Sequence, residues 1–311
     1  MKKVEHIFII NPTAGASDST ETIKKEISNT HIAGNCEIYC TKGPGDATDF
    51  VTRKCSQSAG PLRFYACGGD GTLNEVVNGA VNFPNVSVGV YPCGSGNDFV
   101  KYYGGTAPFL DINALVRGED KQIDLILANG KYCINVFDFG FDTAVLTTME
   151  KVKKIRLLAG KRAYFCGVAK ALFSSMKTPC TVEVDGETIC KDNALLCTVA
   201  NGRYVGSSFK CAPYSDNSDG LLEVCFVKPI SRVTFFRLIK YYTRGEHLGN
   251  PKFENFMIYR RGKRISIVGG KDFNYALDGE LVWQNRVTVE VVEKAINFIV
   301  PHGADSGITT A

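Results

Sequence analysis

Residues 68–75 read Gly68-Gly69-Asp70-Gly71-Thr72-Leu73-Asn74-Glu75, and this stretch decides the fold of the 311-residue chain. The apolar run before it, residues 63–67, predicts a buried strand, and the helical spacing of the apolar residues after Thr72 predicts a helix. A glycine-rich turn in that position lets the backbone approach a phosphate, and a helix N-terminus supplies free N–H donors. A strand-to-helix turn that binds nothing would look the same, so this stretch does not decide function by itself.

Two further loops have the same placement. Residues 11–15 follow the apolar run 7–10, and residues 94–98 follow the apolar run 86–91. Ligands of open parallel sheets bind beyond the carboxyl ends of the strands, so the three loops are expected to converge on one phosphate-binding site. The chain contains neither GxxxxGK[ST] nor a helix-opening GxGxxG, which excludes a P-loop and a dinucleotide fingerprint.

Asp70 does not fit a simple phosphate loop. A carboxylate beside bound phosphates is repulsive unless Mg²⁺ lies between them or the carboxylate makes hydrogen bonds of its own. We therefore expect Asp70 either to be linked to a metal ion or to order the loop.

Strands and helices alternate through the first 125 residues. Further helices are expected from Asp18, over residues 45–56 and from Asn97, and a further strand over residues 37–41. Such alternation predicts an α/β domain with a parallel sheet and helices on both faces.

The pattern changes after about residue 125. Short strands separated by turns, at residues 180–185, 189–190, 194–200 and 221–227, predict an antiparallel β-domain. Helical insertions are expected over 149–176 and 232–242. We therefore predict two domains, residues 1–125 and 126–311, with about the last ten residues packed on the first domain.

Composition excludes several classes of protein. With 44% hydrophobic and 22% charged residues the chain is globular. The twelve cysteines form no CxxC pair and the four histidines form no HExxH motif, so we expect reduced cytosolic thiols and neither a zinc site nor a Ser/His triad. No apolar run approaches the roughly 20 residues of a membrane span, and we read no secretory signal.

Charge is unevenly distributed. Residues 1–130 hold 11 basic and 14 acidic residues, net −3, and the remainder holds 36 − 11 = 25 basic and 32 − 14 = 18 acidic residues, net +7. Residues 151–177 contain eight Lys/Arg and no acid, interleaved with apolar residues. This composition is typical of a helix that rests on an anionic membrane, and a solvated helix packed on its own domain fits equally well. Nothing resembles an RRM, helix-turn-helix or zinc finger, so nucleic acid is not an expected partner.

The ordered set of motifs resembles the diacylglycerol kinase catalytic-domain family of lipid kinases, in its bacterial soluble form. The GGDGT segment alone is shared with NAD kinases, whereas the final DGE and DGLL motifs favour lipid kinases. The matching segments are residues 11–15, Thr41 with 45–47, 68–79, 94–98, 201–202, 219–222 and 278–280.

The resemblance implies an N-terminal nucleotide-binding domain of the NAD-kinase and diacylglycerol-kinase type, a C-terminal antiparallel β-sandwich domain with helical insertions, and an active site in the cleft between them. The implied ATP site is formed by Asn11, Pro12, Thr13, Ala14, Gly15, Thr41, Gly68, Gly69, Asp70, Gly71, Thr72, Leu73, Asn74, Glu75, Gly94, Ser95, Asn97 and Asp98.

Catalytic roles are implied for Glu280, as the base that accepts the lipid hydroxyl proton, and for Asp70 and Asp278. The residue types agree independently of the family, because a carboxylate can accept an alcohol proton without histidine. Without the family, Asp278-Gly279 also reads as a plain β-turn followed by a solvated glutamate.

A structural Mg²⁺ site is implied at Asp216, Asp219 and the carbonyl group of Leu221. The sequence departs from the family here, because it lacks the adjacent Asp-Asp pair. It also has Ala14 and Ser95-Gly96 where Ser and Thr-x are more usual.

We therefore expect a cytoplasmic, peripherally membrane-associated enzyme that uses ATP and Mg²⁺ to phosphorylate a lipid hydroxyl, most simply diacylglycerol, giving phosphatidic acid. The alternatives are a soluble small-molecule kinase of the NAD-kinase type and a nucleotide-binding regulator that has lost catalysis, against which Asp70 and Glu280 argue. Diacylglycerol, phosphatidylglycerol, sphingoid bases and ceramide all stay open as the acceptor, and so does a homodimer.

Overall fold

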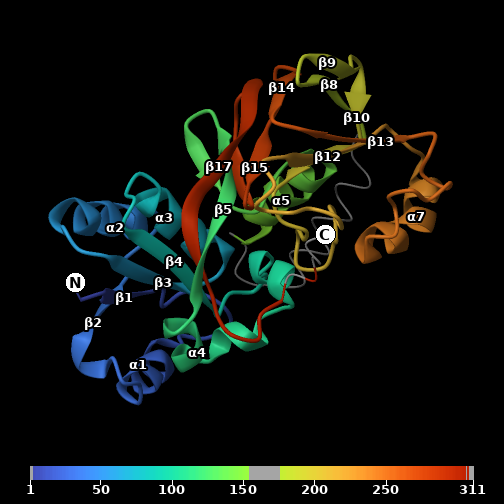
Figure 1. Cartoon of the computed structure of the whole chain (residues 1–311). Helices are drawn as coiled ribbons and strands as arrows, with labels where there is room; N and C mark the ends of the chain where they lie inside the picture. Colours follow the sequence, from blue (N-terminus) through green and yellow to red (C-terminus); the bar gives the residue numbers. More distant parts are fainter. Residues whose placement is uncertain (1–2, 154–175, 306, 308–311) are drawn as a thin grey trace. The chain divides into compact units, whose positions relative to one another are not determined.

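The computed structural model describes residues 3–153, 176–305 and 307 (Figure 1). The chain divides into two compact units. The first contains Met1–Leu125, Asp216–Gly220 and Val292–Ala311, and the second contains Ile126–Ser215 and Leu221–Val291. Two of the boundaries fall inside the long strands β5 (Glu119–Ala128) and β17 (Arg286–Val300).

The sheet of the first unit is parallel. Its strand order is β17-β4-β3-β1-β2, with β17 joining through its last residues, Asn297 and Phe298. The central strands are almost wholly buried, as their runs of Ile, Val, Phe and Tyr require. The bounds are β1 Glu5–Ile10, β2 Cys36–Cys40, β3 Leu62–Gly68 and β4 Val86–Pro92.

Helices cover both faces of this sheet (Figure 1). On one face α2 (Asp46–Gln57) packs on α3 (Asp70–Ala80) so closely that a Cβ at Gly79 would lie 2.8 Å from that of Val51. On the other face lie α1 (Thr20–Ser28) and α4 (Ile112–Val116). The predicted α/β domain with a parallel sheet is confirmed.

The helix predicted to start near Asn97 is short and of the 3-10 type. The structure has two 3-10 helices there, η2 (Phe99–Tyr103) and η3 (Ala107–Leu110). Gly104 and Gly105 both have positive φ, +87° and +112°, which ends η2 after five residues. Phe99 and Tyr103 instead pack on Phe298 of β17, with ring centroids 5.0 and 5.6 Å away.

The second unit is built from antiparallel strands. One sheet has the order β13-β12-β11-β7-β15-β16. A further set of strands has the order β10-β8-β14-β17, in which β17 takes part through its first half. Strand β9 pairs with β8, and β6 pairs with β5. The side chains that these strands bury include Phe137, Phe139, Val182, Phe226 and Ile265. The bounds are β6 Lys131–Cys133, β7 Val136–Gly140, β8 Thr178–Val184, β9 Glu187–Cys190, β10 Asn193–Ala194, β11 Leu196–Ala200, β12 Leu222–Val227, β13 Met257–Gly262, β14 Arg264–Gly269, β15 Tyr275–Leu277 and β16 Glu280–Val282.

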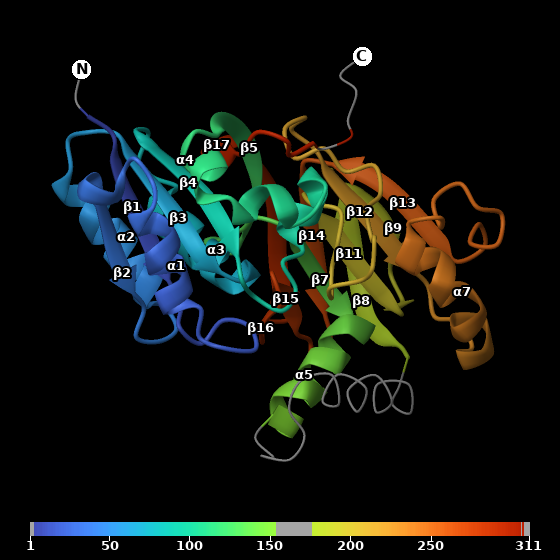
Figure 2. The same cartoon turned by 90° about the horizontal axis from the view of Figure 1, so that it is seen from below.

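Helices α5 and α7, labelled in Figures 1 and 2, belong to the second unit. The first, α5 (Phe141–Lys153), begins eight residues before the predicted start at Met149. Residues 149–153 of the predicted helix over 149–176 belong to α5, and the rest of that helix up to residue 175, with most of the basic segment 151–177, lies outside the described residues. The second, α7 (Arg232–Arg244), matches the predicted helix over 232–242 closely. Among the described residues, every helix falls short of the length and apolar character that a bilayer crossing requires.

Two segments join the first unit although the predicted boundary assigns them to the second domain. They are Asp216–Gly220 and Val292–Ala311. The second of these is longer than the ten terminal residues expected. The buried carboxylate of Asp124 explains part of this, because it accepts hydrogen bonds from the N–H groups of Gly220 and Lys294, each at 2.7 Å. Asn217 likewise donates to the hydroxyl oxygen of Tyr103 at 3.1 Å.

Candidate functional site

The loop after β1 is organised by Asn11. Its Oδ1 accepts hydrogen bonds from the N–H and the hydroxyl of Thr13, at 3.0 and 2.8 Å, which forms a tight Asx turn. Its Nδ2 donates to the Thr72 hydroxyl at 3.0 Å, across 61 residues of sequence. One side chain therefore joins the first predicted loop to the second.

Glycines join the loops where backbones approach each other. A Cβ at Gly15 would lie 2.3 Å from the carbonyl oxygen of Cys93, and a Cβ at Gly94 would lie 2.3 Å from the Cα of Gly69. Gly15 also has φ +77°, a conformation that side chains disfavour. The three loops therefore converge in the first unit, as the sequence predicts.

Asp70 orders the third loop. Its Oδ2 accepts a hydrogen bond from the N–H of Asp98 at 3.0 Å, and its Oδ1 accepts one from the N–H of Phe99 at 3.1 Å. The carboxylate thereby satisfies two N–H groups at the start of η2. This geometry supports the loop-ordering interpretation of Asp70, and its role as a metal-linked or catalytic group stays a prediction.

Gly71 faces open space. A Cβ built on it would have no protein atom within 4 Å, whereas a Cβ at Gly68 would lie 2.3 Å from the Thr72 hydroxyl oxygen. Gly71 lies in the first turn of α3, where backbone N–H groups have no partners within the helix. The N-cap residue, Gly69, has no side chain that could cap them. This helix end can therefore receive an anion such as a phosphate group.

Several predicted ATP-site residues support the loops through burial or through hydrogen bonds to neighbouring segments. Leu73 is buried in the core, and Glu75 accepts hydrogen bonds from the N–H groups of Gly45 and Ala47, at 2.9 and 3.2 Å. Asn74 accepts one from the Asn78 side chain at 3.0 Å, and Thr41 continues the sheet, its N–H bonded to the carbonyl of Ile10 at 2.8 Å.

The remaining predicted residues lie at or near the surface of the loops. Pro12 and Ala14 are half-buried, Ser95 is exposed, and Asn97 closes its own turn by exchanging two hydrogen bonds with Gly94, at 2.9 and 3.1 Å. Asn97 has φ +49°, which asparagine tolerates better than most side chains.

Lys101 is a residue that the motif analysis missed. Its Nζ lies 2.5 Å from Oδ1 of Asp98, which is buried. The ion pair places a cation beside the loop of residues 94–98. The i, i+3 spacing of Asp98 and Lys101 on a helix was the available signal.

In the second unit, Asp278 lies in a two-residue hairpin turn. Asp278 and Gly279, with φ +48° and +85°, connect β15 to β16, as expected for an Asp-Gly turn of type I′. Oδ1 of Asp278 accepts from the N–H groups of Asn135 and Val136, each at 3.0 Å, and Oδ2 accepts from that of Ile134 at 2.9 Å. The Cys133 thiol donates to Oδ1 as well, at 3.1 Å. These bonds make Asp278 a positioning residue for the hairpin.

Glu280 follows this turn and is exposed. It is the first residue of β16 and pairs with Leu277, so its backbone position is fixed by the hairpin. The segment that Asp278 holds is also bound by the predicted Asn201-Gly202 motif, whose two N–H groups donate to the Asn135 carbonyl, each at 2.9 Å. Glu280 therefore presents an accessible carboxylate on a rigid turn.

A pair of acidic residues in the second unit escaped the sequence analysis. Asp138, in the middle of β7, is fully buried, and burial together with the charge of Asp142 raises its pKa well above the usual range. Burial raises the pKa of Asp142 to about 6. One oxygen of each, Oδ1 of Asp138 and Oδ2 of Asp142, is covered and has no hydrogen-bond partner among the described residues. No sequence motif indicates this pair.

Among the implied Mg²⁺ ligands, Asp216 is held by hydrogen bonds within the first unit. Oδ1 of Asp216 accepts hydrogen bonds from the N–H and hydroxyl of Ser218, at 3.0 and 2.7 Å, and from the Tyr102 hydroxyl at 3.3 Å. In the part of the chain that the structure describes, no three His, Cys, Asp or Glu side chains converge as metal ligands. Mg²⁺ usually keeps several waters and takes one or two carboxylates, so a site using Asp216, Asp219 and the Leu221 carbonyl stays a prediction.

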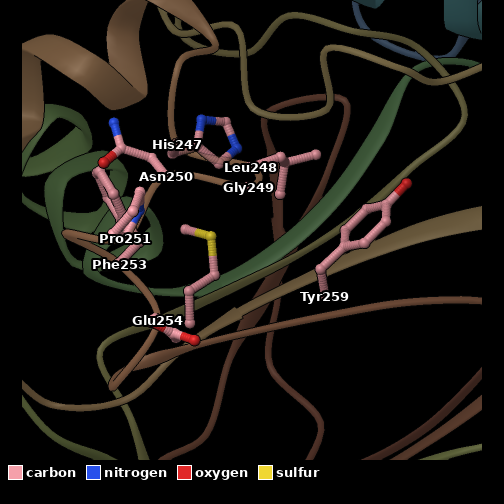
Figure 3. Close-up of a pocket in the computed structure, with 9 residues that line it drawn as sticks. His247, Leu248, Gly249, Asn250, Pro251, Phe253, Glu254 and Tyr259 are labelled. Atoms are coloured by element: carbon pink, nitrogen blue, oxygen red, sulfur yellow. The ribbon is translucent and has the colours of Figure 1, made fainter.

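A separate pocket of about 290 Å³ lies in the second unit between the end of α7 and β13 (Figure 3). It contains none of the predicted site residues. His247 at its wall is buried and bonds through Nε2 to the Cys211 carbonyl at 3.1 Å, and burial lowers its pKa to about 4. The histidine therefore stays neutral at physiological pH and adds no charge to the pocket.

Two family models match the chain. The diacylglycerol kinase catalytic domain matches residues 5–128, and the YegS C-terminal NAD kinase beta sandwich-like domain matches residues 135–300. The two matches follow the predicted order of a nucleotide-binding domain and a β-sandwich domain.

Similar proteins cover nearly the whole chain. A diacylglycerol kinase of Bacillus subtilis is 29% identical over 286 residues, 90% of each chain. A diacylglycerol kinase of Staphylococcus aureus is 27% identical over 298 residues, 95% of this chain and 92% of its own. The crystal structure of a diacylglycerol kinase from Bacillus anthracis str. Sterne superposes with a TM-score of 0.70 at 23% identity, covering 96% of this chain and 98% of that one, and shows that the fold is shared.

Proposed function

Because this chain belongs to the diacylglycerol kinase catalytic-domain family and is a nucleotide-binding kinase, we propose that it transfers the γ-phosphoryl group of ATP to the hydroxyl group of diacylglycerol, forming phosphatidic acid. The observation that carries the proposal is the similarity to relatives named diacylglycerol kinase over nine-tenths of both chains. The two motifs that set lipid kinases apart in the sequence, at residues 219–222 and 278–280, support it.

The loops of the first unit would hold the nucleotide. Phosphate oxygens would accept hydrogen bonds from the N–H groups at the start of α3, near Gly71, where the structure leaves room for them. Asn11 and Asp70 would keep the three loops at the spacing that the phosphates require. Phosphoryl transfer depends mainly on such positioning, because little covalent chemistry falls to the protein.

When Mg²⁺ is bound, its positive charge would neutralise the negative charge that develops on the transferred phosphoryl group. Asp70 remains our predicted link to this ion. Asp216, Asp219 and the Leu221 carbonyl remain the predicted structural site.

Glu280 would accept the proton of the lipid hydroxyl. As the hydroxyl oxygen bonds to the γ-phosphorus, the bond from that phosphorus to the β,γ-bridging oxygen of ATP breaks, and the hydroxyl proton passes to the Glu280 carboxylate. Asp278 would not take part directly, since three N–H groups and a thiol already use its oxygens. It would fix the turn from which Glu280 projects.

The acceptor would be met at a membrane surface, because diacylglycerol resides in the bilayer. We propose that the protein is cytoplasmic and binds the membrane peripherally. The +7 charge of residues 131–311 supports this, because exposed cations are attracted to anionic lipids.

The proposal is tested by transfer of labelled γ-phosphate from ATP to a panel of lipids in mixed micelles. The panel contains diacylglycerol, phosphatidylglycerol, a sphingoid base and ceramide, and NAD serves as a soluble control. We expect label in phosphatidic acid and its loss in Glu280→Gln. Label in NAD without any lipid would overturn the proposal, and label in another lipid would overturn the choice of acceptor alone.

A further inference from the structure

Helix α7 presents two different faces. Ser231 caps its N-terminus by accepting a hydrogen bond from the N–H of Thr234 at 3.1 Å, and Gly245 in the left-handed conformation ends it. Its inner face is formed by the buried Phe235, Leu238 and Tyr242. Phe235 packs on Phe141 of α5 with ring centroids 5.0 Å apart, so the rotation of the helix about its axis is set by this core.

The outer face is a single stripe. It consists of Val233, Phe236, Arg237, Lys240 and Arg244, which follow each other at spacings of three, one, three and four residues. At 100° per residue all five lie within about 60° of Val233, opposite the buried side chains. Val233 and Phe236 are 61% and 62% exposed, which places them among the most exposed large apolar side chains of the described chain.

The stripe is cationic. Helix α7 contains four Lys/Arg and no Asp or Glu. Lys252, from the loop that follows, adds a further cation, since its Nζ lies 2.5 Å from the Tyr241 hydroxyl and 4.2 Å from the centre of that ring. The pKa of Tyr241 is lowered first by the hydrogen bond from Lys252 and then by the charges of Lys240 and Lys252, while Glu246 acts in the opposite direction. The local potential is therefore positive.

We propose that this stripe docks on an anionic lipid bilayer. Phe236 and Val233 would enter the boundary between headgroups and acyl chains, while Arg237, Lys240 and Arg244 would lie against the phosphates. Exposed apolar side chains beside Lys/Arg combine the two contributions that strengthen binding at a bilayer surface, namely buried apolar area and attraction to anionic lipids. Because the inner face is already packed, docking needs no rearrangement of the helix.

A second copy of the chain fits the stripe less well. If the helices of two copies met across a two-fold axis, the cations at 237, 240 and 244 would face the same cations, and like charges placed together across an interface cost several kcal/mol. A surface of negative charge removes that repulsion. Charge complementarity therefore favours the bilayer over self-association.

This inference goes beyond the proposed reaction and names a described surface for the membrane contact. It does not depend on which lipid is phosphorylated, so its test needs neither ATP nor diacylglycerol. A protein that bound vesicles through α7 and phosphorylated no lipid would leave this inference standing and overturn the proposed function.

The test measures co-sedimentation of the full chain with vesicles of phosphatidylcholine alone and with phosphatidylglycerol added. The variant Arg237→Glu/Lys240→Glu/Arg244→Glu removes three cations, and Phe236→Ser removes the apolar anchor. The control is Arg117→Glu/Lys121→Glu/Lys131→Glu, which makes the same charge change at three exposed positions outside α7. Thermal melting of each variant verifies folding.

We expect wild-type binding to require phosphatidylglycerol and to weaken with added salt. At about 1 kcal/mol per cation and 1.4 kcal/mol per tenfold in affinity, the α7 triple variant should bind at least 100-fold more weakly, because it also adds repulsion, while the control should lose far less. Phe236→Ser should weaken binding about tenfold. Equal losses in the α7 and control variants, or unchanged binding in both α7 variants, would overturn the proposal.

A second measurement reports insertion directly. Trp283 is the only tryptophan, so Phe236→Trp in a Trp283→Phe background places a single fluorophore on the stripe. Its emission should shift to the blue on addition of anionic vesicles. An unshifted spectrum in the presence of bound vesicles would overturn insertion at this helix, and a shift that grows with protein concentration without vesicles would indicate a second copy instead.

Discussion

Oδ1 of Asp70 lies 3.1 Å from the backbone nitrogen of Phe99 and accepts its hydrogen bond. A residue at the start of α3 thus holds the loop that follows β4, 29 residues further along the chain. The carboxylate that looked out of place beside a phosphate joins the loop after β3 to the loop after β4.

We expect Asp70→Ala to lose both kinase activity and stability. The change leaves the N–H groups of Asp98 and Phe99 without their acceptor, and each unsatisfied group costs about 1–3 kcal/mol. The melting temperature should fall, and kcat/KM for ATP should fall at least 100-fold. Asp70→Asn, which keeps one acceptor oxygen, should recover part of the melting temperature. Wild-type melting and activity in Asp70→Ala would refute the role in joining the loops.

Gly71→Val should separate binding from folding. Beyond its chain neighbours and the backbone of its own helix, a Cβ at this position meets no protein atom within 4 Å, so the melting temperature should change little, while ATP binding measured by calorimetry should be lost. Gly270→Val is a matched control, since a Cβ there meets only Pro179 at 3.9 Å and lies in the second unit. If Gly71→Val bound ATP as the wild type does, the space beside Gly71 would not be the phosphate site.

Glu280→Gln and Asp278→Asn should differ in kind. Glu280→Gln keeps the shape of the side chain but cannot accept a proton, so kcat should fall by about 10²- to 10⁴-fold with KM for ATP and melting temperature little changed.

Asp278→Asn should reduce turnover less and stability more. An asparagine keeps one acceptor oxygen and replaces the other by an NH₂ group, so at least one of the three backbone N–H donors loses its acceptor, which should cost about 1–3 kcal/mol of unfolding free energy. Initial rates at saturating lipid and ATP, with denaturant unfolding, measure both effects. A Glu280→Gln enzyme within threefold of the wild type would exclude Glu280 as the base.

The Asp138 and Asp142 carboxyl groups should make stability depend on pH. The folded pKa of Asp142 is raised from 3.8 to about 6, so the folded state binds more protons than the unfolded state between these values. The Asp142 contribution to stability is therefore lost as pH rises from about 4 to 6, by up to about 3 kcal/mol at 1.36 kcal/mol per unit. Asp142→Asn should flatten this part of the unfolding free energy profile and stabilise the protein at pH 7. A profile unchanged by the substitution would show that Asp142 ionises normally.

The sequence alone determined the α/β architecture and the positions of the three glycine-containing loops. Alternating apolar strands and amphipathic helices specified the parallel sheet, because both patterns are local. Chain topology then required the loops after β1, β3 and β4 to meet, since parallel strands end at the same edge of a sheet. Glycines at positions such as 15 and 94 could be read as close-approach positions for the same reason.

Only the tertiary structure decided what individual polar groups do. Three examples depend on contacts between residues up to 170 positions apart. Asp70 accepts the N–H of Phe99, Asp278 accepts three N–H groups from residues 134–136, and Asp124 accepts the N–H groups of Gly220 and Lys294. The same holds for the pairing of Asp138 with Asp142 and for the outward stripe of α7. Local patterns report which face of an element is apolar, whereas the partner of a buried charge is chosen by packing, which brings together segments that share no pattern.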